Sequence, residues 1–315
     1  MPARGGSAFG GKIGIFDSGL GGLIILKEII KKLPQYDYIY LGDNARTPYG
    51  NRSQDVIYKF TKQAVDFLFQ QDCELIIIAC NTASAKALRQ IQQEWLPQHY
   101  TDRRVLGVIR PVVEKAVEVA KKKIGVIGTK ATVNSQAYIR EIEKLNPQLE
   151  IVQQACPLLV PLVEEGWEKR PETKKILRYY LRALKLVKID TLILGCTHYP
   201  ILFKEIRGMM GRKIKVLHSG QIVVDSLVDY LQRHPEIESK LDKNSSVMIS
   251  PSINSGQALK FTVSAVEPNH DTEGVTLRQA QGDNLKFFVT DLAEHYQELG
   301  EKWFGQGIRF EKIEL

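Results

Sequence analysis

The fold of this chain is most constrained by a repeated alternation of two hydrophobic patterns. Short runs rich in β-branched residues, each ending in small polar residues, alternate with segments in which apolar residues recur at helical spacing. The runs are KIGIF, DYIYLGD, ELIIIACN, RVLGVI, KIGVIGT, LEIVQQACP, DTLILGCTH and IKVLHSG. Strands that alternate with helices form parallel sheets covered by helices, so the sequence predicts an α/β fold.

A weak internal repeat divides this pattern into two halves. IGIFDSG followed by IIIACNTASAKAL resembles IGVIGTKAT followed by LILGCTHYPIL, and the spacing from Ile13 to Cys80 nearly equals that from Ile124 to Cys196. A chain of 315 residues that is 43% hydrophobic can bury the cores of two domains. The repeat therefore predicts two similar α/β halves, each with a cysteine after a strand.

Composition narrows the class of protein. The net charge of +7 comes from Lys and Arg residues that lie beside acidic neighbours on predicted helix faces, which is typical of solvated surfaces and argues against nucleic acid as a partner. The longest apolar runs, such as 75–79, are far shorter than a membrane span, so no membrane association is predicted. Four cysteines are too few for a disulfide framework, and we expect a cytoplasmic protein with free thiols.

Residues 243–284 interrupt the alternation. They are rich in Ser, Asn, Gly and Gln and have no hydrophobic period, so we interpret them as a surface insertion that is peripheral to folding and catalysis. Periodicity returns in LKFFVTDLAEHYQELGEKWFG, which predicts a strand or turn followed by an amphipathic helix.

Polar clusters follow several of the predicted strands. Ligands of open α/β sheets bind beyond the carboxyl ends of the strands, so these clusters are candidates for a single site. They are Asp17-Ser18, Asp43-Asn44 leading to Pro48-Tyr49-Gly50, Cys80-Asn81-Thr82, Thr129 with Thr132, and Cys196-Thr197-His198. Neither an HExxH nor a CxxC motif is present, and no metal site is predicted.

The glycine loop IGIFDSGLGGL does not fit a dinucleotide. Ile24 occupies the last position of a G-x-G-x-x-G match, and the carboxylate of Asp17 would repel a phosphate. The loop therefore predicts a smaller ligand. Asp17 has a second interpretation, because it could simply cap the helix that follows.

The cysteines also have a structural interpretation. A lone cysteine after a strand is most often a small buried hydrophobic residue, and we assign Cys73 and Cys156 to that class. Cys80 and Cys196 differ because they occupy equivalent positions of the repeat and are followed by hydroxyl or amide side chains. His198 follows Cys196 closely enough to be its acid–base partner, whereas Glu164, taken alone, could be a solvated helix charge.

Six motifs together resemble the cofactor-independent aspartate/glutamate racemase superfamily. They are IGIFDSGLGGL, GDNARTPYG, ACNTASA, IGVIGTKATVNSQAY, CPLLVPLVEEG and GCTHYPIL, and the likeness covers roughly 13–225 and 285–305. The resemblance implies two pseudo-symmetric domains with parallel-rich sheets, an active site in the cleft between them, and a homodimer. It places residues 1–109 with 214–315 in one domain and 110–213 in the other.

The resemblance also implies roles for individual residues. Cys80 and Cys196 become the two bases, with Asp17 assisting Cys80 and with His198 and Glu164 near Cys196. The substrate-binding positions that match are Asp17, Ser18, Pro48, Tyr49, Gly50, Asn81, Thr82, Thr129, Thr132, Thr197 and His198. The implied reaction interconverts L-glutamate and D-glutamate without a cofactor and supplies D-glutamate for peptidoglycan.

Departures and alternatives remain. GVIRPVVEKA lacks the glycine usual after its proline, so the hinge or the dimer contact could differ. His218 stands where an acidic residue is common. An aspartate racemase, or another amino-acid racemase of the superfamily, would differ in the depth of the side-chain pocket. A cysteine hydrolase using Cys196 and His198 would leave Cys80 without a role, and a binding module would explain neither thiol.

Overall fold

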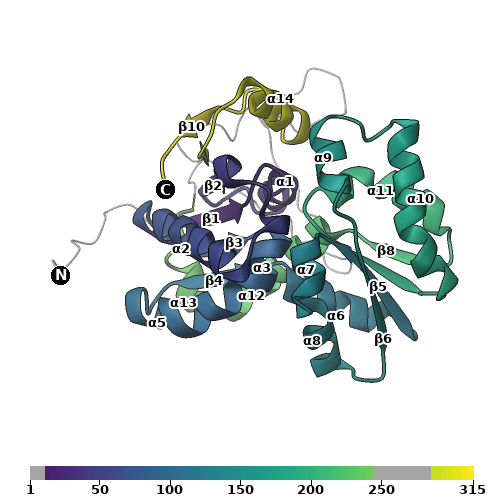
Figure 1. The fold of residues 1–315 in the computed structure, drawn as a ribbon. Helices are drawn as coiled ribbons and strands as arrows, with labels where there is room; N and C mark the ends of the chain where they lie inside the picture. The colour runs from purple at the N-terminus through teal and green to yellow at the C-terminus, as the bar shows by residue number, and fades with distance from the viewer. Residues whose placement is uncertain (1–10, 244–284) are drawn as a thin grey trace, which may run out of the picture.

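The computed structural model describes residues 11–243 and 285–315 (Figure 1). The predicted insertion at 243–284 therefore lies, apart from Lys243, outside the described residues. Within the two described ranges, no helix combines the length and the hydrophobicity that crossing a membrane requires.

A six-stranded sheet forms the larger half of the molecule. Its strands run in the order β10-β9-β2-β1-β3-β4, and every neighbouring pair is parallel. The strands are β1 (Lys12–Asp17), β2 (Tyr38–Gly42), β3 (Cys73–Ile78), β4 (Arg104–Gly107), β9 (Leu285–Val289) and β10 (Phe310–Lys312).

A four-stranded parallel sheet forms the smaller half, in the order β6-β5-β7-β8. Its strands are β5 (Lys123–Gly128), β6 (Glu150–Ala155), β7 (Thr191–Gly195) and β8 (Lys215–Leu217). The predicted α/β class is thus confirmed. The predicted boundary at residue 213 falls just before β8, but β8 pairs with β7, so Lys215–Leu217 belongs with the smaller sheet.

Helices cover both sheets (Figure 1). In the first part of the chain they are α1 (Leu23–Lys32), α2 (Gln54–Gln70), α3 (Asn81–Lys86), α4 (Leu88–Gln90), α5 (Leu96–His99), α6 (Ile109–Val119), α7 (Lys130–Asn134) and α8 (Ala137–Leu145). In the second part they are α9 (Leu159–Glu164), α10 (Pro171–Leu186), α11 (Phe203–Met210), α12 (Ser219–Arg233), α13 (Pro235–Glu238) and α14 (Glu294–Trp303). Short 3-10 turns lie at η1 (Asn44–Arg46), η2 (Tyr49–Asn51) and η4 (Tyr199–Leu202), and a π-helical turn lies at η3 (Ile91–Trp95).

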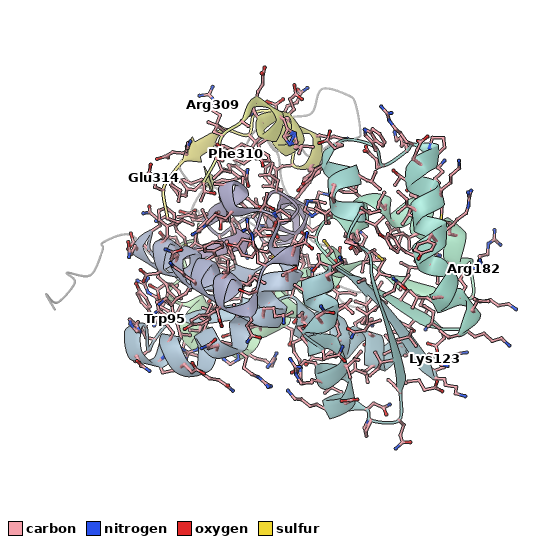
Figure 2. All side chains as sticks on the ribbon, in the orientation of Figure 1. Trp95, Lys123, Arg182, Arg309, Phe310 and Glu314 are labelled. Carbon is pink, nitrogen blue, oxygen red and sulfur yellow. The ribbon has the colours of Figure 1, made fainter. Side chains whose placement is uncertain are left out.

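Burial explains why the strands could be identified from apolar runs. All residues of β2 and β7 are buried, because helices cover both faces of each sheet. The helices carry the complementary amphipathic pattern, and charged side chains such as Arg182 of α10 project outward (Figure 2). One apolar cluster runs through both halves, with α12 packed against α1 and α6.

The C-terminal segment returns to the larger sheet. β9 pairs in parallel with β2, β10 pairs with β9, and α14 packs near α1 and beside α9 (Figure 1). The strand and the helix predicted after residue 284 are therefore present, and the short strand β10 is an addition to them.

Candidate active site

The predicted polar clusters meet where the carboxyl ends of strands from the two sheets face each other, with α3 packed against α7 across the junction (Figure 1). Hydrogen bonds cross between the halves. The Tyr138 hydroxyl donates to Oδ1 of Asn81 over 2.7 Å, and the hydroxyl oxygens of Thr82 and Thr129 lie 2.9 Å apart. Strand ends far apart in the sequence thus form one buried polar region.

In the larger half, Cys80 lies between the end of β3 and the start of α3. It caps the N-terminus of α3: its Sγ accepts a hydrogen bond from the Ala83 backbone N–H over 3.5 Å, and the Ser18 hydroxyl lies 3.2 Å from the sulfur. Burial, together with the charge of Asp17, raises the pKa of the thiol to about 12, and the Cys196 charge adds to that rise. A charge on Cys196 therefore disfavours ionisation of Cys80.

Cys196 holds the equivalent place at the end of β7. Its Sγ lies 3.9 Å from Nδ1 of His198, whose Nε2 lies 3.0 Å from a carboxylate oxygen of Glu164. Burial lowers the pKa of His198, but the hydrogen bonds to Cys196 and Glu164 outweigh it and raise the pKa to about 10. His198 is therefore suited to hold a positive charge between a thiolate and a carboxylate.

This pKa predicts a dependence of stability on pH. The folded protein keeps the His198 proton up to about pH 10, whereas an unfolded imidazole releases it near about pH 6.5. The stabilisation is therefore complete below about pH 6.5 and is lost as the pH rises through about 10. Between pH 7 and pH 10 we expect the urea midpoint to fall less in His198→Gln than in the unmodified protein. Replacing the exposed His295 by Gln is the matched control, and equal slopes in all three proteins would contradict the assignment.

Asp17 lies between the two cysteine clusters. It is fully buried, and its Oδ2 accepts a hydrogen bond from the Gly19 N–H over 3.0 Å. Burial raises its pKa, while the charge of His198 and a hydrogen bond from Thr197 oppose the rise. Gly22, and not Asp17, is the N-cap residue of α1, although the Asp17 carboxylate accepts a hydrogen bond from the Gly22 backbone N–H.

The glycine loop has a packing role that the sequence did not reveal. A Cβ atom on Gly21 would lie 2.4 Å from the Thr197 hydroxyl oxygen and 2.8 Å from Nδ1 of His198. Gly21 therefore lets the loop after β1 approach the Cys196 cluster of the other half directly. Close approach, rather than phosphate binding, explains the glycine at this position.

Three threonines form a compact hydroxyl cluster at the junction. The hydroxyl of Thr82 lies 2.9 Å from that of Thr129 and 3.2 Å from that of Thr132, and the latter two are 3.0 Å apart. Gly50 packs against this cluster, since a Cβ there would lie 2.9 Å from the Thr129 Cβ. Hydroxyl groups can rotate to donate, so the cluster can bind a carboxylate.

Asp43 organises the neighbouring segment, although the sequence indicated no individual role for it. Its buried carboxylate accepts two bonds from Nε of Arg46, at 2.9 and 2.7 Å, one from the Tyr49 hydroxyl at 2.5 Å and one from the Thr290 hydroxyl at 2.8 Å. The carboxylate thereby holds the Pro48-Tyr49-Gly50 segment against the junction. The spacing of three residues between Asp43 and Arg46 could have indicated their ion pair in the sequence. The hydrogen bond from Thr290 joins distant segments and could not be inferred.

We expect Asp43→Asn to destabilise the fold by about 3 kcal/mol, because it leaves the Arg46 guanidinium without a full counter-charge in a largely buried site. Urea unfolding measures this change. The control is Asp229→Asn, which weakens an ion pair in which two nitrogens of Arg233 donate to Oδ2 of Asp229. Both side chains are 60% exposed, so this change should cost less than about 1 kcal/mol. Equal losses in the two variants would contradict the structural role of Asp43.

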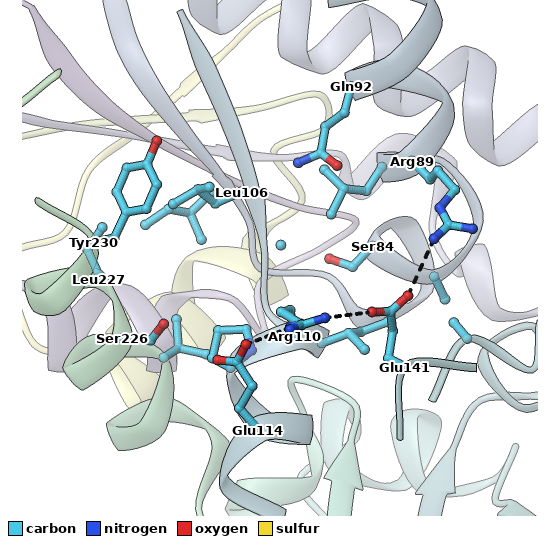
Figure 3. A pocket seen from close by; sticks show the side chains of 18 of the residues that line it. Ser84, Arg89, Gln92, Leu106, Arg110, Glu114, Glu141, Ser226, Leu227 and Tyr230 are labelled. Carbon is cyan, nitrogen blue, oxygen red and sulfur yellow. Dashed lines mark hydrogen bonds and ion pairs between the residues drawn. The ribbon is translucent and has the colours of Figure 1, made fainter. Parts of the chain in front are cut away.

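A separate cavity of about 550 Å³ lies beside α3 (Figure 3). Ser84 and Ala85 line it, but neither Cys80 nor Cys196 does. At its rim Glu141 of α8 forms ion pairs with Arg89, at 3.6 Å, and with Arg110, at 3.3 Å. The candidate active site is thus distinct from this cavity.

Comparisons with known proteins agree with this geometry. The family model for Asp/Glu/Hydantoin racemases matches residues 24–227. The glutamate racemase of Geobacter metallireducens is 46% identical over 211 residues, which cover 66% of this chain and 76% of that protein. The glutamate racemase of Streptococcus gordonii is 37% identical over 305 residues, covering 96% of this chain and 98% of that protein.

A solved structure extends the likeness to the fold. The crystal structure of glutamate racemase from Francisella tularensis in complex with D-glutamate is 30% identical, covers 97% of this chain and 98% of its own, and superposes with a TM-score of 0.76. Family model, curated relatives and fold all lead to the same assignment. The chain belongs to the Asp/Glu/Hydantoin racemase family.

Proposed function

We propose that this protein is a glutamate racemase that interconverts L- and D-glutamate without a cofactor, using Cys80 and Cys196 as its two bases. The observation that supports the proposal most is the symmetry of the site: the larger half contributes the buried Cys80 after β3 and the smaller half the buried Cys196 after β7, and the two sulfurs are close enough for the charge of Cys196 to raise the pKa of Cys80. The relatives named glutamate racemases support the choice of substrate.

The chemistry requires two groups in opposite states. Inverting the α-carbon means removing its proton from one face and delivering a proton to the other, so a thiolate and a thiol must flank the carbon. We assign Cys196 to the proton of L-glutamate and Cys80 to the proton of D-glutamate. The two groups exchange states in each turnover, and the next substrate must be the opposite enantiomer unless protons exchange with water.

The residues around each thiol take different roles in this proposal. His198, held by Glu164, stabilises the Cys196 thiolate by its positive charge. Asp17 cannot stabilise a thiolate, because its negative charge raises the pKa of Cys80. We therefore assign Asp17 as the group that accepts or relays the Cys80 proton once substrate has entered.

The α-proton of an amino acid is weakly acidic, so the carbanion-like transition state needs preorganised donors and exclusion of water. We assign the hydroxyl cluster at the junction to a substrate carboxylate, because it joins both halves. The remaining proposed substrate contacts are Asp17, Ser18, Pro48, Tyr49, Gly50, Asn81, Thr197 and His198.

The wider role belongs to the same proposal. Through the family resemblance we propose that the D-glutamate supplies peptidoglycan synthesis in the cytoplasm and that the enzyme is a homodimer. Size-exclusion chromatography with light scattering tests the dimer, and complementation of a D-glutamate auxotroph tests the supply of D-glutamate.

Circular dichroism tests the activity itself. Extensively dialysed and chelator-treated protein is incubated with L- or D-glutamate, and the signal should decay to zero from either side; L- and D-aspartate serve as competing substrates. Turnover of aspartate in preference to glutamate would overturn the substrate assignment. An inactive protein that pyridoxal phosphate restores would overturn the mechanism.

A further inference from the structure

Trp303, the last residue of α14, packs against the histidine of the Cys196 cluster. The ring centroids of Trp303 and His198 lie 5.4 Å apart, and the ring planes are nearly perpendicular, at 88°. The indole is 7% exposed, so its ring fills space that would otherwise be open beside the imidazole. The C-terminal helix of the larger half therefore forms part of the wall of a site in the smaller half.

A second contact joins the same helix to the segment that carries Glu164. Lys302 pairs with Glu168, four residues beyond the end of α9, over 2.8 Å. Figure 1 shows α14 lying beside α9. The Lys302–Glu168 pair thus ties the helix that carries Trp303 to the segment that follows Glu164, the partner of Nε2 of His198.

The imidazole needs such a wall because its function depends on orientation. Nε2 must meet Glu164 while Nδ1 faces Cys196 and Thr197, so a rotation of the ring breaks both contacts at once. The charged groups that act on His198 are Glu164 on α9, Cys196 after β7 and Asp17 after β1. An indole is also the preferred aromatic neighbour of a cation.

We propose that Trp303 is a positioning residue for the half of the reaction that takes place at Cys196, because its indole fixes the plane of the His198 ring. This inference rests on the proposed function for its kinetic consequences. It makes the C-terminal segment act directly on the Cys196 face of the site.

The effect of Trp303 on the proton transfer at Cys196 is measured by isotope effects. The equilibrium constant between enantiomers is one, so kcat/KM is equal in both directions and cannot reveal an asymmetry. The α-deuterium effect on kcat/KM can, because it reports which proton transfer limits the rate. A slower step at Cys196 raises the effect for L-[2-²H]glutamate and lowers it for D-[2-²H]glutamate.

The experiment compares Trp303→Phe and Trp303→Leu with a matched control, Trp95→Phe. Trp95 is similarly buried, at 8% exposure, and stacks on His99 at the periphery of the larger half (Figure 2). We expect kcat/KM to fall by about 3-fold in Trp303→Phe and about 10-fold in Trp303→Leu, with opposite changes of the two isotope effects. Parallel changes of both isotope effects, or changes no larger than in Trp95→Phe, would overturn the proposal.

Histidine NMR separates this proposal from the proposed function. The His198 ring signals, assigned by their loss in His198→Gln, should shift in both Trp303 variants, and their titration midpoint should move to lower pH in Trp303→Leu. This readout needs no substrate. If the unmodified protein does not racemise glutamate, the proposed function fails, whereas unmoved His198 signals would refute the contact with Trp303 itself.

Discussion

Cys80→Ser and Cys196→Ser are each expected to lose racemisation of glutamate by at least about 10³-fold, because a general acid–base group is removed and a hydroxyl ionises far less readily than a thiol. Each variant should keep one half-reaction. A substrate analogue with a β-leaving group needs only one deprotonation before elimination, so Cys80→Ser should eliminate from the L-analogue through Cys196, and Cys196→Ser from the D-analogue through Cys80.

The two other cysteines provide matched controls. Cys73 and Cys156 are as deeply buried but lie outside the proposed chemistry, so Cys73→Ala and Cys156→Ala should keep racemisation within a few-fold. Swapped enantiomer preferences would reverse the assignment of the two faces. Racemisation near the parent rate in either serine variant would refute the two-base scheme.

Asp17→Asn should lower racemisation by at least about 100-fold, because the amide cannot accept the Cys80 proton. The same change removes the charge that raises the pKa of Cys80, so alkylation of the Cys80 peptide by iodoacetamide should become faster. Activity and thiol reactivity are thus expected to move in opposite directions, which a general distortion of the site would not produce.

The stability of this variant is a further part of the test. Burial raises the pKa of Asp17 above its unfolded value, so the group costs stability as the pH rises through that pKa. At pH 7, Asp17→Asn should therefore melt at the same temperature as the parent or higher. The exposed Asp225→Asn is the control for both measurements. An Asp17→Asn protein that is fully active, or markedly less stable, would contradict the role given to Asp17.

The strands could be predicted largely because they are buried on both faces. A buried parallel strand appears in the sequence as a continuous apolar run bounded by polar residues, and β1, β2, β3, β5 and β7 coincide with such runs. The last strand, Phe310–Lys312, has one apolar residue and pairs along a single side, so no local pattern marked it.

The site was predictable to the extent that it lies at strand ends. Cys80 and Cys196 each follow a strand of their own sheet, and the internal repeat of the sequence relates the two positions. Contacts that depend on how the two halves pack had no such signal. The approach of Gly21 to His198, the bond from Thr290 to Asp43 and the contact of Trp303 with His198 all join segments distant in sequence.

The most direct test of the two-base account is the fate of the α-proton in D₂O. Unlabelled L-glutamate is incubated with the enzyme, and both enantiomers are separated and analysed by mass spectrometry at low conversion. If Cys196 removes the proton and Cys80 delivers another from the opposite face, the D-glutamate formed carries deuterium while the recovered L-glutamate remains protiated. A single base serving both faces would contradict the account, and it would appear as product that retains the substrate proton or as deuterium entering both enantiomers at equal rates.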